Sequence, residues 1–415
     1  MTSKPLKIAF ISQYFYPEQF FNNSIACELI NRGHAVQVFC CVPNYGTGNF
    51  FAGYNNWLAR SEIWKGVNIE RVFTIPRGQN SIQLTLNYLC YPIAGMWTIV
   101  RRKLWIPDVS FVSMPSPVFQ AFLGLFLKWI WKVPTVFWIQ DLWPETAEVT
   151  LRIKSKFFLF VLRAICKWLY SGADIVLVQS EAFIDGLISL GIEEARIRLF
   201  PNTAPPLFRP MMPQEAPSEA LYFTKGKFNL VFAGNIGESQ DFDNLVETAE
   251  ILKQEVDIQW IIIGSGRGLE RAVALVEEKK LTESFSFLGR QEEDIMPNFF
   301  AHADTLLVSL RDTPIFSRTV PYKVQCYLAC GKPIIASLSG EGARILAKSG
   351  SGFVVPAGKP LDLADAILKM ARTPHDERRL MGERGRKYFD ENYSQKVVYE
   401  ILERALTDAV RRVDK

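Results

Sequence analysis

The chain has 415 residues, too many for one compact core, so at least two domains are expected. Apolar residues make up 48% and charged residues 22%, an ordinary globular composition that excludes a disordered or collagen-like chain. The three histidines, His34, His302 and His375, lie far apart, which argues against a polyhistidine metal centre and against a histidine-based triad.

The cysteines and the apolar runs predict a cytoplasmic protein. None of the seven cysteines forms a Cys-x-x-Cys pair, so they are expected to be reduced thiols. The first residues run into a strand-like segment at 8–11 without the pattern of a signal peptide. The longest apolar stretch, 118–131, is shorter than the roughly 20 residues that cross a bilayer.

The net charge of +4 is unevenly distributed along the chain. Residues 1–200 carry 19 basic and 13 acidic side chains, whereas residues 201–415 carry 28 and 30. A moderately basic, aromatic-rich first half suits an anionic partner such as a phospholipid surface, a lipid diphosphate or nucleic acid. An ordinary solvated surface is the alternative.

Strand-like and helix-like segments alternate in the first half. Strands are predicted at 8–11, 35–41, 69–73, 109–113, 135–139 and 175–179, and helices at 24–32, 84–103, 119–131 and 155–170. The proline-rich segment 200–217 predicts an inter-domain linker.

The alternation then begins again. Strands are predicted at 228–233, 259–263, 286–288, 305–309, 333–337 and 353–355, and helices at 243–253, 268–279 and 322–330. Such a pattern predicts two α/β domains with doubly wound parallel sheets, facing each other across a cleft. Ligands of such sheets bind beyond the carboxyl ends of the strands, so the loops there are the candidates for chemistry.

Three segments could carry that chemistry. Ala233-Gly-Asn-Ile-Gly237 is a strand that enters a glycine turn, whose N–H groups could approach a phosphate, and Gly264-Ser-Gly266 repeats the form. Lys323 opens a helix after Pro321, where a mobile cation adds to the positive helix end. Gln140 and Asp141 end a buried strand and could meet a reacting hydroxyl. The alternatives are a structural turn, a solvated lysine and a turn-capping aspartate.

Taken in order, several motifs resemble the family 4 glycosyltransferases of the GT-B fold. They are Arg32-Gly-His-Ala-Val36, Pro43-Asn-Tyr45, Gln140-Asp-Leu-Trp-Pro-Glu145, Ala233-Gly-Asn-Ile-Gly237, Pro321-Tyr-Lys323 and Ala329-Cys-Gly-Lys-Pro333. The resemblance spans nearly the whole chain. It is strongest to the bacterial branch that builds exopolysaccharide, O-antigen and capsule, including colanic-acid and N-acetylfucosamine transferases.

The resemblance implies two Rossmann-like domains and a retaining, metal-independent transfer from a nucleotide-sugar linked to UDP, GDP or dTDP, with no cofactor. Residues 1–202 would form the acceptor domain and residues 203–394 the donor domain, with a C-terminal helix at about 395–415 packing back on the first. The acceptor oxygen would attack from the side of the leaving group, with the phosphate as its base. The acceptor would be a saccharide linked to polyprenyl diphosphate at the cytoplasmic face of the inner membrane.

The resemblance also implies roles for particular residues. Lys323 would neutralise the leaving diphosphate, and Asp141 and Glu341 would be the other catalytic candidates. The donor contacts would come from Asn235, Gly237, Gln240, Gly264, Arg290, Lys323 and Glu341. The acceptor contacts would come from Asn44, Tyr45, Gln140 and Asp141.

The chain departs from the family pattern at several positions. Two glutamates that the family commonly carries are replaced by Arg318 and Cys326, and the basic residue usually found after the glycine turn is Gln240. The paired glycines of a first loop are replaced by Phe20-Phe-Asn-Asn23, and no histidine follows the strand that ends near residue 140. Glu341 is the candidate to contact the donor hydroxyls instead, the alternative being a plain loop acid.

Two basic, apolar helices bear on membrane attachment. The segment 155–170 carries Lys156, Arg163 and Lys167 and is preceded by Lys154, and the segment 88–103 ends in Arg101-Arg-Lys103. Such helices can lie in a membrane interface or simply cover a sheet. With the resemblance, they favour peripheral attachment to the inner leaflet.

Two rival functions remain open. A nucleotide-sugar epimerase of similar shape would need acid–base carboxylates or histidines that this chain mostly lacks. A catalytically inactive relative that serves as a binding subunit is suggested by the missing glutamates. Nucleic-acid binding is not expected, because the basic charge is modest and no known module is present.

Overall fold

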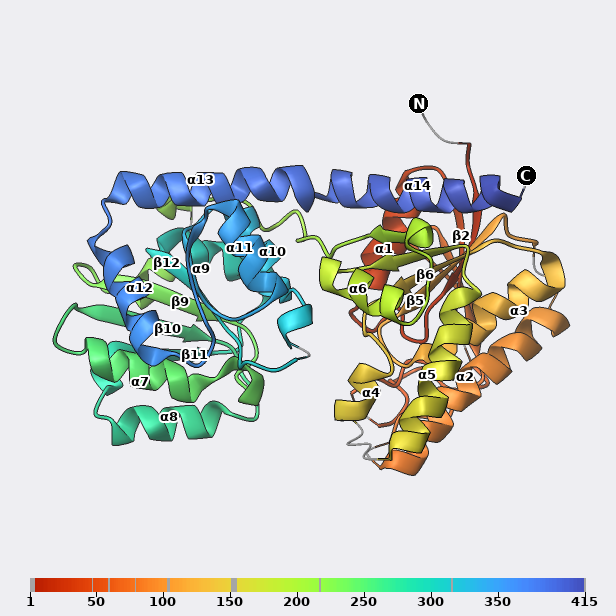
Figure 1. Cartoon of the computed structure of the whole chain (residues 1–415), viewed down its shortest axis with the longest axis horizontal. Coiled ribbons are helices and arrows are strands. Elements are labelled where there is room, and N and C mark those ends of the chain that lie inside the picture. Colours follow the sequence, from red (N-terminus) through yellow and green to blue (C-terminus); the bar gives the residue numbers. More distant parts are fainter. Residues whose placement is uncertain are drawn as a thin grey trace. The chain divides into compact units, whose positions relative to one another are not determined.

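Two sheets organise the chain, and each is covered by helices on both faces (Figure 1). The computed structural model describes residues 4–46, 48–58, 60–78, 80–102, 105–150, 155–215, 218–314 and 316–413. Contacts divide the chain into unit 1, residues 1–200 with 399–415, and unit 2, residues 201–398. Lys103 and Lys154, counted above among the basic residues of two helices, lie outside the described residues.

Unit 1 contains sheet 1, in the order β3-β4-β2-β1-β5-β6-β7-β8. Its strands are β1 (Lys7–Ile11), β2 (Ala35–Cys41), β3 (Ser61–Trp64), β4 (Val67–Val72), β5 (Val109–Met114), β6 (Thr135–Ile139), β7 (Ile175–Val178) and β8 (Ile197–Leu199). Its helices are α1 (Phe21–Asn31), α2 (Ser81–Arg101), α3 (Ala121–Trp131), α4 (Glu145–Thr150), α5 (Lys156–Ser171) and α6 (Glu181–Ser189).

The pairs within sheet 1 are parallel, except that β3 pairs antiparallel with β4 at the edge. The sequence analysis did not anticipate β3, because a strand whose residues are only partly buried lacks the apolar run of a central strand. The helix predicted at 84–103 begins earlier, at Ser81, because the side chain of Asn80 accepts a hydrogen bond from Gln83 N at 2.7 Å.

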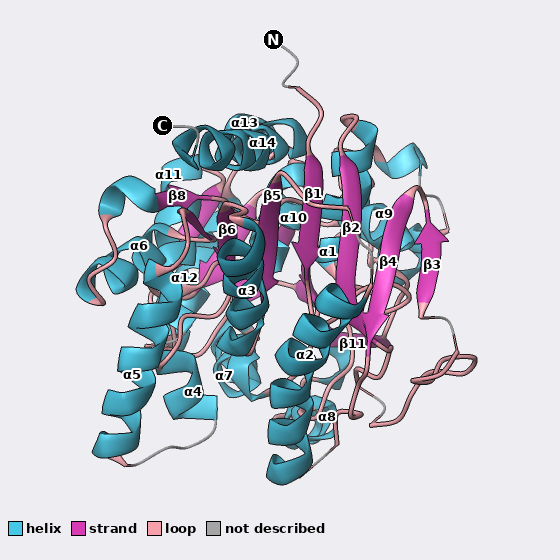
Figure 2. Cartoon of the chain, turned by 90° about the vertical axis from the view of Figure 1, so that its right-hand side faces the viewer, coloured by secondary structure: helices cyan, strands magenta, loops and turns pink. Residues whose placement is uncertain are grey.

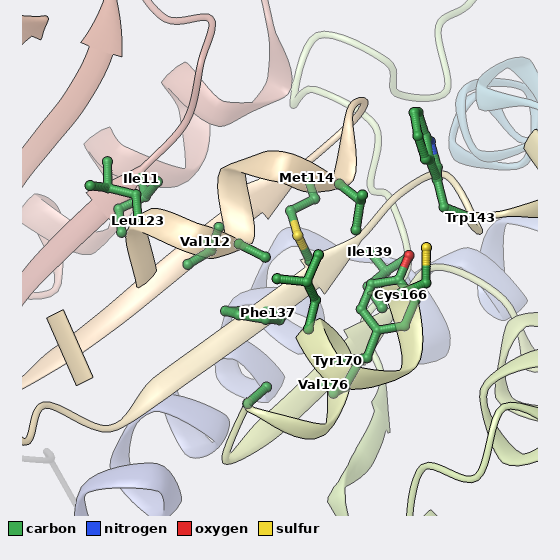
Figure 3. Close-up of a cluster of buried hydrophobic side chains, with 14 of the residues drawn as sticks. Ile11, Val112, Met114, Leu123, Phe137, Ile139, Trp143, Cys166, Tyr170 and Val176 are labelled. Atoms are coloured by element: carbon green, nitrogen blue, oxygen red, sulfur yellow. The ribbon is translucent and has the colours of Figure 1, made fainter. Parts of the chain in front are cut away.

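One core of unit 1 lies between sheet 1 and the helices α2, α3 and α5, which are in front of the sheet in Figure 2. Ile11, Val112, Phe137 and Val176 point from four strands into this cluster, where residues of α3 and α5 meet them (Figure 3). Alternating side chains of a strand face opposite sides of its sheet, so the remaining apolar residues serve the other face.

The other face of sheet 1 is covered by α1 and by the end of the chain. Phe21 of α1 stacks on Tyr399, with ring centroids 6.5 Å apart, and Arg32 forms a salt bridge of 2.9 Å with Glu403. Both partners belong to α14 (Gln395–Val413). Residues 399–413 therefore complete the fold of unit 1.

Unit 2 contains sheet 2, in the order β11-β10-β9-β12-β13-β14, with every pair parallel. Its strands are β9 (Phe228–Ala233), β10 (Ile258–Ile263), β11 (Phe285–Gly289), β12 (Thr305–Ser309), β13 (Ile334–Ser337) and β14 (Gly352–Val355). Its helices are α7 (Phe242–Leu252), α8 (Leu269–Glu278), α9 (Met296–His302), α10 (Tyr322–Cys330), α11 (Glu341–Ser349), α12 (Pro360–Arg372) and α13 (His375–Asn392).

Unit 2 has a core on each face of its sheet. Leu230 and Phe232 of β9 pack with α7, α8 and α12, whereas Val231 and Ala233 pack with α9, α10 and α11. Among the described residues, no helix is both long and apolar enough to span a membrane.

Candidate active site

A glycine turn follows β9 at the switch point of sheet 2, where the connections run to β10 on one side and the sheet continues to β12 on the other. Gly237 N, assigned from the sequence to a donor phosphate, donates to Gln240 Oε1 at 3.1 Å. Asn235 Nδ2 donates to the same oxygen at 3.2 Å. Gln240 thus caps the turn, and a phosphate bound at Gly237 would take the place of its amide oxygen.

The second glycine turn packs against the first. Ile236 N donates to Ser265 O and Gly268 N to Ile236 O, both at 2.9 Å. A Cβ at Gly264 would lie 1.8 Å from Gly234 O, so only glycine allows the two turns to approach this closely. Gly264 N already donates to Gly289 O at 2.8 Å, so Gly264 shapes the site and has no free N–H for a phosphate.

Lys323 lies beside the first glycine turn. Tyr327 of α10 accepts a hydrogen bond from Ala233 N at 2.9 Å, which fixes α10 against the end of β9. Lys323 lies one turn earlier on the same face of the helix. Its Nζ is 3.8 Å from the centroid of the Phe232 ring and 3.1 Å from the position of a Cβ on Gly234.

The ammonium group of Lys323 is shielded from solvent and has no hydrogen-bond partner. This burial lowers the pKa of Lys323 to about 7. A buried cation without a hydrogen-bond partner is costly to the fold, and an anion at the glycine turn would remove that cost. The structure therefore brings together Gly237, Asn235, Gln240 and Lys323.

The other candidates of unit 2 are placed less closely. Arg290 follows β11 and is exposed, on the far side of β10 from the glycine turn. Glu341 begins α11 and is buried, and its carboxylate accepts hydrogen bonds from Arg344 Nε at 3.0 Å and Nη2 at 2.7 Å. A contact between Glu341 and a donor hydroxyl would therefore have to compete with Arg344.

Neither replacement of the usual glutamates restores a carboxylate. Arg318 lies in a short 3-10 helix, 316–318, and Cys326 is buried within α10, where burial raises the pKa of its thiol well above the ordinary range.

Arg311, which follows β12, was not among the residues predicted from the sequence. The backbone N–H of Arg311 donates to Ser239 O at 2.8 Å, and its guanidinium lies 3.2 Å from Asp241 Oδ1. A charged residue directly after a strand was the available signal.

Unit 1 presents a buried polar chain at the switch point of sheet 1, between β1 and β5. Gln140 Nε2 donates to Ser113 Oγ at 2.9 Å, and Ser113 Oγ donates to Asn22 Oδ1 at 2.7 Å. Asn22 Nδ2 in turn donates to Ser12 Oγ at 2.7 Å. Through Ser113 and Asn22, this chain of hydrogen bonds connects Gln140 to Ser12, which follows β1.

Asp141, the next residue, is half-buried, and burial alone raises its pKa to about 6. Burial also raises the pKa of Tyr88, a rise that Arg77 opposes and to which Tyr45 and Asp141 add. Asp141 thus lies within electrostatic reach of Tyr88 on α2.

Asn44 and Tyr45 are held by a glutamate that the sequence analysis did not single out. Glu18 Oε1 accepts hydrogen bonds from Asn44 N at 2.8 Å and Tyr45 N at 2.7 Å. Burial raises the pKa of Glu18, and the hydrogen bonds that its carboxylate accepts from three backbone N–H groups oppose the rise. Glu18 therefore acts on this loop as a positioning residue.

A tyrosine cluster is defined as Tyr14, Phe20, Tyr45 and Tyr88 around Arg77. Tyr45 was predicted from the sequence as an acceptor contact, and the other members were not predicted. The guanidinium of Arg77 lies 4.8 Å from the centroid of Tyr45 and 5.9 Å from that of Tyr88. Tyr14 stacks on Phe20 with centroids 5.6 Å apart. Arg77 forms no ion pair with any residue that the structure describes. No single motif signals this cluster, because its members come from separate loops and α2.

Among the described residues, no group of three or more histidine, cysteine, aspartate or glutamate side chains could hold a metal ion. The two sets of residues offer cationic and hydrogen-bonding groups: a lysine with a glycine turn in unit 2, and a carboxylate with an arginine and aromatic rings in unit 1.

Comparisons with known proteins identify the family of this chain. Residues 21–203 match the model of the glycosyl transferase 4-like domain, and residues 227–373 match that of glycosyl transferases group 1. The chain belongs to family 4 of the glycosyltransferases. It is 22% identical to the putative colanic acid biosynthesis glycosyl transferase WcaI of Escherichia coli over 73% of this chain and 75% of that one. It is 26% identical to the probable glycosyltransferase WbjE of Pseudomonas aeruginosa over 70% of each chain.

Solved structures confirm the predicted GT-B fold. Sucrose-phosphate synthase from Thermosynechococcus elongatus matches with a TM-score of 0.74 at 17% identity, over 98% of this chain and 99% of that one. Anabaena Alr3699/HepE in complex with UDP matches with a TM-score of 0.72 at 14% identity, over 97% and 100%.

Proposed function

We propose that this glycosyltransferase moves a sugar from a nucleotide-sugar, held by unit 2, to a lipid-linked saccharide, held by unit 1. The transfer is retaining and needs no metal, and it serves the assembly of exopolysaccharide, O-antigen or capsule. The observation that carries the proposal is the buried Nζ of Lys323, which has no hydrogen-bond partner, beside the glycine turn. A site that keeps a cation without a partner is suited to a diphosphate.

In the proposed reaction the bond between C1 of the sugar and the diphosphate oxygen breaks, and the diphosphate keeps the electron pair. Lys323 and the backbone N–H of Gly237 stabilise the negative charge that develops on the diphosphate. Donors that are already in position before the bond breaks are effective in this role. The acceptor oxygen bonds to C1 on the same face and gives its proton to the departing phosphate. Asp141 and Gln140 position the acceptor hydroxyl.

The relatives support the donor and the pathway. HepE was solved with UDP and with UDP-glucose, and the trehalose-6-phosphate enzyme of E. coli with UDP-2-fluoro glucose. WcaI is described as acting in colanic acid biosynthesis, and the similar structure WaaG in lipopolysaccharide biosynthesis. A uridine nucleotide is therefore the first donor to test, before its guanosine and deoxythymidine counterparts.

Peripheral attachment to the inner leaflet is part of the proposal. Large apolar side chains of α2 and α5 face solvent, among them Ile93 at 67%, Trp97 at 64%, Phe157 at 77% and Phe160 at 71% exposure. Both helices lie on the same face of sheet 1 as α3 (Figure 2). Lys156, Arg163 and Lys167 on α5 suit anionic headgroups.

Binding and turnover with the variant Lys323→Met test the donor site. UDP should raise the melting temperature of the wild-type protein, and a panel of UDP-, GDP- and dTDP-sugars then identifies the donor. K323M should lose this shift and about 100-fold or more of turnover. Lys332→Met is the matched control, because Lys332 also has a pKa lowered by burial, to about 8, while its Nζ donates to Ala301 O at 2.8 Å.

An unchanged UDP response in K323M would contradict the proposed donor site. Nucleotide binding without turnover on any donor would favour the alternative, a catalytically inactive binding subunit. This alternative is motivated by Cys326, whose buried thiol stands at a position where a glutamate is usual.

A further inference from the structure

A groove of about 1020 Å³ runs along α2 in unit 1. This volume is at the upper end of the range of small-molecule sites, about 300–1,000 Å³. Its walls are mostly apolar, and its lining residues include Val42, Ile75, Leu86, Leu89, Cys90 and Trp97. The groove also contains Arg60, Arg71, Arg101 and Arg102, and no acidic residue is among its described lining residues.

Helix α2 is built to present this groove to an apolar ligand. Its solvent-facing side chains recur at helical spacing, and they are Ile82, Leu86, Leu89, Ile93, Trp97 and Val100. The helix carries no aspartate or glutamate along its 21 residues. A surface helix normally covers its outer face with polar side chains, so this stripe indicates a hydrocarbon partner.

One end of the groove adjoins the tyrosine cluster. Ile75 in the groove is two residues from Arg77, and Val42 is three residues from Tyr45, while Leu89 directly follows Tyr88. Two residues span at most about 7 Å of chain. Asn87 Nδ2 donates to Ile75 O at 2.6 Å, which ties α2 to the loop that carries Arg77. Arg77 does not line the groove itself, but it follows the lining residue Ile75 by two positions, is half-buried and forms no ion pair with any described residue.

Two arginines of the groove that form no ion pair with any described residue lie on tryptophan rings. Arg60 is 5.4 Å from the centroid of Trp57, and Arg101 is 5.9 Å from that of Trp97. Arg102 and Arg71, in contrast, are paired with Glu70 and Glu62. Tryptophan and basic side chains together are typical of the membrane–water interface, where a lipid chain could leave the groove.

We infer that the α2 groove holds the hydrocarbon chain of a lipid diphosphate acceptor, and that Arg77 in the tyrosine cluster binds its diphosphate. The inference rests on the proposed function, since it names where the lipid-linked substrate of that transferase binds. A guanidinium offers a diphosphate paired N–H donors, and the rings of Tyr45 and Tyr88 fix its plane. The occupant is thus a single amphiphile whose two chemical parts match the two parts of the site.

Cys90 provides a probe of the groove. Its Sγ is directed to Phe73 O at 3.5 Å, and Cys90 and Cys27 are the only described cysteines that are not buried. In a Cys27→Ser background, the rate at which a maleimide alkylates Cys90 can be followed by mass spectrometry. Farnesyl diphosphate should slow this rate about tenfold or more at saturation, whereas inorganic diphosphate and UDP should not change it.

Two substitutions separate the two parts of the site. Arg77→Gln should weaken protection by farnesyl diphosphate by about 10- to 100-fold in concentration, as expected for losing a charged hydrogen-bond donor, and should not alter protection by farnesol. Leu89→Glu should abolish protection by both. Ile188→Glu on α6 is the matched control, because Ile188 is 41% exposed and Leu89 is 43% exposed.

Three outcomes would overturn the inference. Equal protection by farnesol and farnesyl diphosphate, with R77Q indifferent, would mean an apolar surface without a diphosphate site. Protection by phosphatidylglycerol vesicles that farnesyl diphosphate does not increase would mean that bilayer lipid fills the groove. Protection that survives L89E would place the ligand elsewhere. The UDP melting shift on the same samples reports on unit 2 alone, so a failure of the donor proposal is seen separately.

Discussion

At the scale of single residues, burial shifts the pKa values of two residues of the proposed mechanism, Lys323 and Asp141, toward each other. Burial lowers the pKa of Lys323 to about 7 and raises that of Asp141 to about 6. The sequence could identify both positions, because each follows or opens a regular element in a recognisable motif. It could not predict the shifts, because these depend on how much water the surrounding chain excludes.

The pH dependence of kcat/KM follows from these directions. In the proposed mechanism an ionised Asp141 accepts the hydrogen bond that positions the acceptor hydroxyl, which requires a pH above about 6. A protonated Lys323 stabilises the leaving diphosphate, which requires a pH below about 7. We expect a narrow bell-shaped profile with its maximum between the two values. Asp141→Asn should remove the acid limb, and Lys323→Arg should move the alkaline limb upward. A profile that is flat from pH 6 to 8 would contradict the assignment.

Lys323 should also limit stability. The unfolded lysine titrates at 10.5 and the folded one at about 7, so between these values the unfolded state binds more protons and stability rises with pH. K323M should therefore raise the free energy of unfolding at pH 7 by about 1–3 kcal/mol. The difference from wild type should shrink toward pH 10. Denaturant unfolding at several pH values measures it, and a destabilised variant would argue against the buried charge.

At the scale of elements, the proposed donor site depends on two glycine turns whose backbones pack directly against each other, without room for a side chain between them. The sequence identified both turns as possible phosphate loops. The structure shows that the Gly264 turn instead supports the Gly237 turn, through the hydrogen bonds of Ile236 and Gly268. Gly264→Ala should therefore cost about 3 kcal/mol or more, because a Cβ would lie 1.8 Å from Gly234 O. Thermal unfolding with and without UDP should show both a lower melting temperature and a smaller shift.

Helix α5 should contribute to membrane attachment. Phe160→Ser should weaken binding to vesicles of phosphatidylethanolamine and phosphatidylglycerol by about tenfold, because the ring no longer enters the interface. Leu361→Ser on α12 in unit 2 is the matched control, with 67% exposure against 71% for Phe160. Vesicle co-sedimentation at two salt concentrations measures the apolar and the electrostatic contributions to binding separately, because salt screens only the second. Equal binding of F160S and wild type would exclude α5 from the attachment surface.

At the scale of the whole molecule, the chain passes from unit 1 to unit 2 and returns to unit 1 at its end. Leu402, Leu406 and Ala409 of α14 are fully buried, and Glu403 forms a salt bridge with Arg32. Deleting residues 399–415 should therefore destabilise unit 1 and expose its apolar face. Unit 2 should keep its UDP-dependent melting transition, because its core is complete without that segment. Calorimetry with UDP distinguishes the two, and a truncation that melts like the full chain would contradict the assignment of 399–415 to unit 1.

The sequence by itself determined the alternation of strands and helices, the two α/β halves and the family, because these follow from short-range patterns of apolar residues, glycines and prolines. It also identified Lys323, Gly237, Gln140 and Asp141, which stand next to strand ends or helix starts. Only the tertiary structure decided that Lys323 is buried without a partner, that Glu341 is bound by Arg344, and that Arg77 is surrounded by aromatic rings. These features arise from residues far apart in the chain, and their energies depend on the exclusion of water by neighbours that no local pattern specifies.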